Sequence, residues 1–584
     1  MHLLGIILRL VIFFCSCMGY WEFFRRKTRV NIYFLPVLTV AVQAFMLFMA
    51  GLLNILSVIS FLMVFAGIAA LICFIVSDRG ISWVKHYGKT GYVYFGVMLV
   101  AILLSVNGKV VSHFDNFSHW ALVVRQMLLT DRFPNFQDNI IAFQEYPLGS
   151  AAFIYYVAKI VGHAESVWMF AQGYMITACI LPVFMYCRKN RVLSFVFMCL
   201  TTNLIFVYNI KITELLVDTL LPLAAMSMLL FTYYAGKNKD TCGELYLTIP
   251  FSIWILQIKN AGIYFCVIAT LWILSGIKSR KGKLRKGEAV KTALTAFAPY
   301  VSLLLWQKHC DYVFLKADTS NHAMTAQNYM TELSEKSLND IWTICSSWIK
   351  FCLTYKEVWL VFFCFAVVGV VYYFICRNSR KQFYLAAIFA IVLYITYQIG
   401  TMAMYVFSMP LNEALVLAGS TRYCRSILLA VFYVILILYM KILSRLNRVN
   451  IKNTVSCIAL VAAVIVTWGF TNNSFQLFFN IPGDNCPAER KWIESNVSRY
   501  NIPEGAKCCI LAQEDNRGYL RYICRYVLQS PQIKAETVSS QEDLEGVTDW
   551  DYVFIYDNEN PIIQDWIQEY YPDQLNQNVI IRGE

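Results

Sequence analysis

Long apolar runs separated by short charged segments dominate this chain. The runs 32–50, 55–77, 91–106, 165–187, 382–408, 425–441 and 454–472 lie near the length of about 20 residues that an α-helix needs to cross a bilayer. Residues 245–277 are too many for one helix and contain a polar break at Lys259-Asn260, which predicts a helical hairpin. The pattern predicts a polytopic α-helical membrane protein with about 14 spans.

One apolar run, 148–162, does not fit a span. It is the shortest run, contains Lys159 and ends at Gly162. We therefore expect an interfacial helix that lies on the outer surface. This interpretation leaves a long outside loop at 107–164.

Basic residues gather in short segments between the apolar runs. These segments are 25–29, 79–89, 188–191, 237–239, 278–286, 377–381 and 441–452. The positive-inside rule places them in the cytoplasm, which puts both termini outside. The net charge of +12 arises largely from these segments, so no nucleic-acid partner is expected.

The last part of the chain is polar and has a different pattern. "AKCCILAQ" and "DYVFIYD" are typical of buried strands, and "NRGYLRYICRYVL" and "NPIIQDWIQEYY" of amphipathic helices. We expect N-terminal transmembrane helices at 1–90, a transmembrane core at 91–472 and a small extracytoplasmic α/β domain at 473–584. Most of the 19 cysteines lie in apolar runs, but Cys508, Cys509 and Cys524 lie in this domain and could pair.

Ionisable residues gather on the predicted outer side of this very apolar protein, where they are costly unless they face water or serve a site. They are Asp115, His119, Glu145, Glu214, Asp218, Lys259, His322, Glu413 and Arg422. Asp115 and His119 are four residues apart and would share a helix face, and Glu214 and Asp218 would sit near the top of a span. Taken singly, each is more simply a helix cap, a snorkelling lysine or a surface histidine. Together they predict a site.

Several of these segments resemble the GT-C glycosyltransferases, polytopic enzymes that use polyprenyl-phosphate-linked sugars. "FDNFSHW" and "EYPLGSAAFIYY" resemble the first outer loop of that family, and "TELLVDTLLPL" and "QIKNAGIYF" resemble its acidic helix top and lysine-containing break. The likeness covers roughly residues 91–440 and is greatest to a Gram-positive bacterial type with a similar outer domain. Two features depart from the family. Three spans precede the core, and Asp115-Asn116 stands where many members have two acidic residues, so a divalent cation (Mg²⁺ or Mn²⁺) stays an open alternative.

The resemblance implies an enzyme of the bacterial plasma membrane that takes a polyprenyl-phosphate-linked sugar and a glycan or lipid-linked acceptor. Asp115 would deprotonate the acceptor hydroxyl, and Arg422 and Lys259, with His322, would offset charge on the leaving phosphate. The other candidates would bind substrate: His119, Glu145, Glu214, Asp218 and Glu413. Two alternatives are a transporter or flippase of lipid-linked sugars and a non-catalytic partner in envelope assembly. A transporter would show internal repeats and charges at the midplane.

Overall fold

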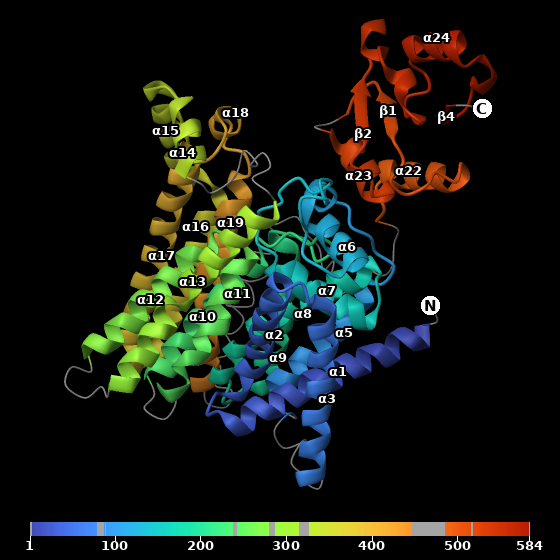
Figure 1. Cartoon of the computed structure of the whole chain (residues 1–584). Helices are drawn as coiled ribbons and strands as arrows, with labels where there is room; N and C mark the ends of the chain where they lie inside the picture. The colour runs from blue at the N-terminus through green and yellow to red at the C-terminus, as the bar shows by residue number, and fades with distance from the viewer. Residues whose placement is uncertain are drawn as a thin grey trace.

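The computed structural model describes residues 3–78, 87, 89–237, 242–279, 286–314, 326–446, 485–515 and 518–582. A large helical bundle is built from the chain up to α19, and a small α/β domain at the C-terminus lies above α6 in the view of Figure 1. The predicted span 454–472 and His322 lie outside the described residues.

The helices follow the predicted apolar runs closely. They are α1 Leu3–Lys27, α2 Leu35–Leu52, α3 Leu56–Asp78, α5 Thr90–Val106, α6 Ala121–Thr130, α7 Gly149–Val161, α8 Glu165–Ile180, α9 Arg191–Tyr208, α10 Leu220–Lys237, α11 Thr248–Ile258, α12 Gly262–Ser279, α13 Lys286–Val313, α14 Ala326–Ser334, α15 Leu338–Thr354, α16 Lys356–Ile375, α17 Arg380–Phe407, α18 Leu411–Leu415 and α19 Ser420–Arg445. Among the described residues, nine helices are long and apolar enough to cross a membrane. The protein is therefore a membrane-embedded helical protein, while the predicted total of about 14 spans is not confirmed.

The predicted hairpin is present as α11 and α12, which are separated at Lys259-Asn260. The location predicted for 148–162 is wrong. Helix α7 does form there, but its residues are almost all buried, and it packs against α2, α6 and α8 inside the bundle instead of lying on the surface. Lys159 misled the prediction because it pairs with Asp131 at 2.6 Å instead of marking a membrane interface.

Three of the basic segments meet at one end of the bundle. Lys441 Nζ donates to Gln382 Oε1 at 3.3 Å and lies 4.7 Å from the centre of the Tyr186 ring. Asn190 Nδ2 donates to the Leu443 carbonyl at 2.9 Å. Helix α19 has 26 residues, or about 39 Å of length, and its N-terminal end is therefore far from this basic end.

The C-terminal domain is a four-stranded sheet with helices, as the sequence predicts. Its elements are α22 Ala488–Arg499, β1 Cys508–Ala512, α23 Tyr519–Leu528, β2 Ile533–Thr537, β3 Tyr552–Ile555, α24 Pro561–Tyr570 and β4 Val579–Ile581, in strand order β2-β1-β3-β4. Strand β1 is parallel to β2 and β3, with Cys508 opposite Ile533 and Tyr552, and β4 is antiparallel to β3. Its central position explains why every residue of β1 is buried. Cys508, Cys509 and Cys524 are free thiols.

Candidate functional site

The segment that follows α5 is irregular up to His113, and a helical stretch then begins with Phe114 and Asp115. After α5, Gly108 adopts a left-handed conformation (φ +71°) that favours glycine, and the chain turns away from the helix axis. Asp115 then directly precedes a short π-helix, η2 (Asn116–Trp120), which continues into α6. Short π-helical segments occur frequently at functional sites.

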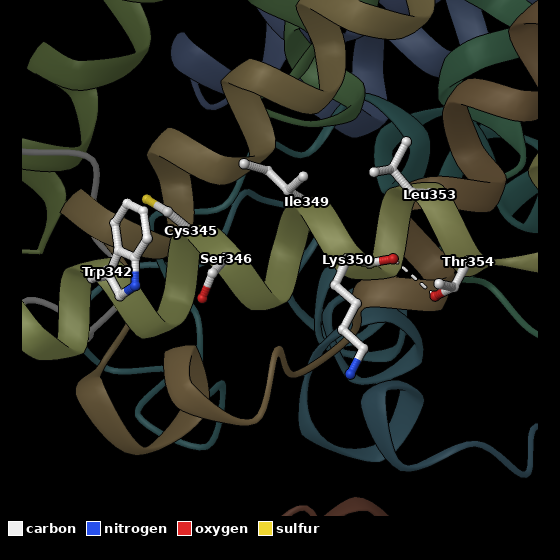
Figure 2. Close-up of a pocket in the computed structure, with 7 residues that line it drawn as sticks. All are labelled: Trp342, Cys345, Ser346, Ile349, Lys350, Leu353 and Thr354. Atoms are coloured by element: carbon white, nitrogen blue, oxygen red, sulfur yellow. Dashed lines mark hydrogen bonds between the residues drawn. The ribbon is translucent and has the colours of Figure 1, made fainter.

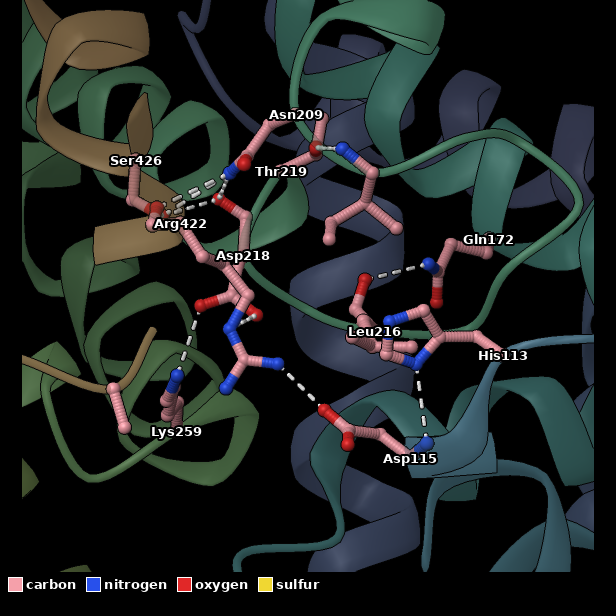
Figure 3. A network of polar contacts seen from close by, with 12 residues as sticks. His113, Asp115, Gln172, Asn209, Leu216, Asp218, Thr219, Lys259, Arg422 and Ser426 are labelled. Atoms are coloured by element: carbon pink, nitrogen blue, oxygen red, sulfur yellow. Dashed lines mark hydrogen bonds and ion pairs between the residues drawn. The ribbon is translucent and has the colours of Figure 1, made fainter. Parts of the chain in front are cut away.

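Four charged side chains from distant parts of the chain form one ion-pair cluster, which comprises Asp115, Asp218, Lys259 and Arg422 (Figure 3). Arg422 Nη1 lies 2.5 Å from Asp115 Oδ2, and Arg422 Nε lies 3.6 Å from Asp218 Oδ2. Lys259 Nζ donates to Asp218 Oδ1 at 2.9 Å. Asp115 and Arg422 are 307 positions apart in the chain, so only tertiary packing brings them together.

The two carboxylates of the cluster have different surroundings. The Asp218 side chain is 5% exposed, whereas those of Asp115 and Arg422 are 28% and 29% exposed. Burial alone would raise the pKa of Asp218, but Lys259 and Arg422 outweigh burial and hold that pKa below its usual value. Burial alone would lower the pKa of Lys259, but the Asp218 carboxylate raises it above its usual value. Both groups are therefore charged at neutral pH.

Loops and helix ends position the cluster. Lys259 occupies the extended break between α11 and α12 (φ −163°), which turns its side chain out of the helix pattern. Asp218 lies in the irregular segment between α9 and α10, and its carbonyl accepts a hydrogen bond from Ser426 Oγ at 3.0 Å. Arg422 lies in the first turn of α19. Its neighbour Tyr423 has its ring centre 5.2 Å from Lys259 Nζ and 5.6 Å from Arg422 Cζ, which adds cation–π contacts.

Glu214 and Asp218 lie just before α10, near the top of a span as predicted, but they do not act as one pair. Helix α10 begins only at Leu220, and the irregular segment before it sends the two carboxylates to different partners. Glu214 accepts hydrogen bonds from Ser112 Oγ at 2.6 Å and from the His113 N–H at 3.0 Å. Asn116 Nδ2 also donates to Glu214. Burial raises the pKa of Glu214, and these donors oppose that rise. Glu214 thus holds the segment that carries Asp115.

His119 does not join the cluster but lies in an aromatic group. Its ring centre is 4.8 Å from that of Trp120, 5.2 Å from that of Tyr146 and 5.9 Å from that of Phe143. Burial lowers the pKa of His119 to about 3, against the opposing charge of Asp115, so the imidazole is neutral at physiological pH. Asp115 and His119 therefore do not act together, since Asp115 binds Arg422 while His119 packs among aromatic rings.

Two other candidates lie elsewhere in the described structure. The Glu145 carbonyl accepts a hydrogen bond from Trp306 Nε1 of α13 at 3.0 Å, and burial, followed by the charge of Asp311, raises the pKa of the Glu145 carboxyl. Glu413 lies on α18, where its carbonyl accepts from the Ala418 N–H at 3.0 Å. Neither belongs to the ion-pair cluster defined above.

Tyr146 is a cluster neighbour that the sequence analysis did not single out. Burial raises the pKa of its hydroxyl, and the charges of Lys259, Arg422 and Asp115 all act on that pKa, which places the hydroxyl close to the cluster. It stands beside Glu145 in the same "EYPL" segment. No signal in the sequence distinguishes Tyr146 from the other tyrosines of the chain.

A second ion pair on α19 lies near the cluster but has only one carboxylate. Arg425 Nη2 lies 2.5 Å from Glu357 Oε1, and Arg425 Nε lies 2.9 Å from Glu357 Oε2. Arg425 Nε also donates to the Tyr355 hydroxyl at 3.1 Å. We refer to Arg425 and Glu357 as the α16–α19 pair.

The C-terminal domain docks onto the segment that leads to Asp115. Arg490 Nη2 lies 2.7 Å from Glu165 Oε1, which also accepts from the Tyr526 hydroxyl at 2.7 Å. The Val111 N–H donates to Glu165 Oε2 at 2.6 Å, and the Val111 carbonyl accepts from Arg490 Nη1 at 2.9 Å. This domain seam, formed by Glu165, Arg490 and Tyr526, therefore engages both backbone groups of Val111.

Aromatic contacts extend the seam to the residue next to Asp115. The Phe114 ring centre lies 5.0 Å from that of Tyr522 and 6.4 Å from that of Tyr519. The Tyr519 hydroxyl donates to the Ser112 carbonyl at 2.9 Å. The domain thus contacts the 110–117 segment along its length.

A shallow apolar hollow of about 400 Å³ lies in a different place, along one face of α15. Figure 2 shows its lining side chains, which all belong to this one helix: Trp342, Cys345, Ser346, Ile349, Lys350, Leu353 and Thr354. The opposite face of α15 packs Ile344 and Trp348 into a small core with α17. A helix with one apolar face outward fits contact with lipid better than it fits chemistry on a polar substrate.

The cluster can bind an oxyanion and accept a proton, because it joins two fixed cations to a partly exposed carboxylate. Its residues do not fit a divalent cation. Both carboxylates already engage Lys259 or Arg422, and within the described ranges no three His, Cys, Asp or Glu side chains come together as metal ligands would. No family model, curated protein or solved structure matches this chain.

Proposed function

We propose that the protein is a membrane glycosyltransferase of the GT-C type. It would move a sugar from a polyprenyl-phosphate donor to a glycan or lipid-linked acceptor on the outer face of a bacterial plasma membrane. The observation that carries the proposal is the ion-pair cluster, in which Asp115 lies 2.5 Å from Arg422 and Lys259 completes the cationic side. These are the acid–base and phosphate-binding groups that the reaction needs.

The proposed reaction is a single displacement at the anomeric carbon. Asp115 takes the proton of the acceptor hydroxyl as the acceptor oxygen bonds to the anomeric carbon, and the bond from that carbon to the phosphate oxygen breaks. The electron pair of that bond goes to the leaving polyprenyl phosphate, whose added negative charge Arg422 and Lys259 offset. Asp218 keeps the two cations in place, since it contacts both of them.

The surroundings of Lys259 support access from lipid. Helices α12 and α17 adjoin there, and the Tyr264 hydroxyl of α12 lies 2.8 Å from the Thr396 hydroxyl of α17. Apolar side chains of both helices face outward, among them Leu271 and Ile399. A polyprenyl chain could lie along such a surface while its phosphate reaches the cluster.

The distribution of charge supports the outer side. The cluster lies at the N-terminal end of α19, and the basic segments around Asn190, Gln382 and Lys441 lie at its other end. Under the positive-inside rule a basic end is cytoplasmic, which supports an outer location for the cluster and the C-terminal domain.

A reconstituted transfer assay tests the proposal. The purified full chain in proteoliposomes is given polyprenyl-phosphate-linked sugars and candidate acceptors, and sugar–acceptor product and free polyprenyl phosphate are measured in equal amounts. A lipid that crosses the bilayer with its sugar still attached would favour the flippase alternative. Neither product nor lipid movement with any donor would favour the non-catalytic partner.

A further inference from the structure

Arg422 has two carboxylate partners that differ in how firmly they are held. Asp218 is buried and also binds Lys259 at 2.9 Å, so its place in the cluster is fixed by two cations. The Asp115 carboxylate is 28% exposed, and Arg422 is its one ion-pair partner among the described residues. Of the two carboxylates, Asp115 is the one that can leave.

The Asp115 carboxylate stands where a phosphate oxygen would bind. Guanidinium groups bind carboxylate and phosphate oxygens with the same geometry, through one or two N–H groups. Arg422 Nη1 is engaged by Asp115 at 2.5 Å, while the buried Arg422 Nε faces Asp218 Oδ2 at 3.6 Å, beyond hydrogen-bond distance. A phosphate oxygen in this place would take over the hydrogen bond that Arg422 Nη1 makes to Asp115.

We propose that the cluster is an exchange site in which the donor phosphate displaces Asp115 from Arg422 and thereby frees Asp115 to act as the base. This inference rests on the proposed function. The exchange keeps the charge of the cluster, because a sugar phosphodiester carries one negative charge, as the Asp115 carboxylate does. The released carboxylate is already partly exposed and returns to water.

The exchange sets an order of binding. While Asp115 is paired with Arg422, its Oδ2 is occupied and the carboxylate stays bound to the cation instead of the acceptor hydroxyl. The donor therefore binds first. Without the donor, the acceptor meets an enzyme in which Asp115 and Arg422 neutralise each other. An enzyme of this kind does not deprotonate an acceptor hydroxyl when no sugar donor is present.

The α16–α19 pair provides the matched control. Arg425 lies on the same helix and binds Glu357 through two nitrogens, Nε and Nη2, whereas Arg422 binds Asp115 through Nη1 alone. Glu357→Gln and Asp115→Asn make the same chemical change next to two arginines of one helix.

Binding of a short prenyl phosphate tests the exchange without turnover. The purified full chain, as wild type, Asp115→Asn, Arg422→Gln and Glu357→Gln, is titrated with farnesyl phosphate, with inorganic phosphate and with farnesol. We expect Asp115→Asn to bind farnesyl phosphate about two- to fivefold more tightly than wild type, because the competing charge is gone. Arg422→Gln should weaken binding at least about tenfold, and Glu357→Gln should leave it unchanged.

The three ligands distinguish binding of the phosphate group from binding of the prenyl chain. Farnesol should bind all four proteins equally, and inorganic phosphate should follow the same order of variants as farnesyl phosphate, at lower affinity. Equal or weaker farnesyl phosphate binding by Asp115→Asn overturns the exchange. If Asp115→Asn binds more tightly but the wild-type protein transfers no sugar, the exchange stands and the glycosyltransferase proposal fails. If the wild-type protein transfers sugar but Asp115→Asn does not bind more tightly, the glycosyltransferase proposal stands and the exchange fails.

Discussion

Helix α19 carries two arginines that form ion pairs of different kinds. Arg425 binds both oxygens of one carboxylate, that of Glu357, which α16 holds in place. Arg422 instead divides its contacts between Asp115 and Asp218, which lie in two different connections between long helices. A bidentate pair is complete in itself, whereas a guanidinium shared between two partners keeps the capacity to bind another oxyanion.

The difference teaches where to look for chemistry in a membrane protein of this kind. Both arginines are charged and partly buried, and both lie at the same end of the bundle, so neither charge nor burial separates them. The number and exposure of their partners do. The α16–α19 pair should support structure, and the cluster around Arg422 should support function.

The largest effect is expected at Asp115. Replacing it with Asn should lower sugar transfer by about a hundredfold or more, since general-base catalysis contributes that much, while the protein level in the membrane stays normal. Transfer is measured with labelled donor in proteoliposomes, and Glu357→Gln serves as the control that should keep near-wild-type activity. Full activity of Asp115→Asn would show that Asp115 is not the base. The cluster around Arg422 would then differ from the α16–α19 pair in structure but not in function.

The next effect separates the two arginines directly. Arg422→Gln should raise the KM for the lipid donor about tenfold or more, because a charged hydrogen bond to the phosphate is lost, with a smaller change in the KM for the acceptor. Arg425→Gln should leave both KM values near wild type and lower the thermal midpoint of unfolding instead, since Glu357 loses its partner. If Arg425→Gln raised the donor KM and Arg422→Gln lowered only the thermal midpoint, Arg425 and not Arg422 would be the donor-binding residue.

A smaller effect is expected at the domain seam, which contacts only one of the two sites. Glu165→Gln removes the negative charge that holds Arg490 and the Val111 N–H, so the 110–117 segment should loosen. We expect about a three- to tenfold loss of kcat with little change in donor KM. Hydrogen exchange should rise in 110–117 and stay unchanged around Glu357. Equal protection of 110–117 in wild type and variant would show that the seam does not position Asp115.

The last effect concerns stability at acid pH and leaves activity at neutral pH untouched. Burial lowers the pKa of His119 from 6.5 to about 3, so below pH 6.5 the unfolded chain takes up a proton that the folded protein does not. Folding should therefore lose about 1.4 kcal/mol for each pH unit below 6.5, down to about pH 3. His119→Phe should remove this acid sensitivity and change nothing at pH 7.5, as measured by unfolding midpoints from pH 7.5 to 4.5. The same acid sensitivity in both proteins would contradict a neutral, buried imidazole.

Much of the fold was predictable from the chain, because membrane helices and parallel strands both follow from local patterns. Apolar length predicted the helices, the polar pair at Lys259-Asn260 predicted the hairpin break, and "AKCCILAQ" and "DYVFIYD" predicted β1 and β3. The interpretation of 148–162 failed because Lys159 looks the same in sequence whether it faces lipid headgroups or, as it does, the carboxylate of Asp131.

The candidate site was predictable only as a set of residue types. The family resemblance implied separate roles for Asp115, Lys259 and Arg422. It left Asp218 unranked beside Glu145 and Glu214, and no pattern in the chain separates those three carboxylates. The direction of a side chain in an irregular segment depends on tertiary contacts. Tyr146, which follows Glu145 in the chain, was therefore not predicted as a site residue, although it lies near the cluster.

What the sequence by itself determined is a membrane-embedded helical protein with a small α/β domain, because hydrophobic length and the period of apolar residues act locally. Only the tertiary structure decided which charges meet. Arg422 finds Asp115 across 307 positions of chain, and the two connections between long helices that present Asp115 and Asp218 have no periodicity that a sequence can display. Ion pairing depends on distance in space, and the folded packing of the helices alone sets that distance.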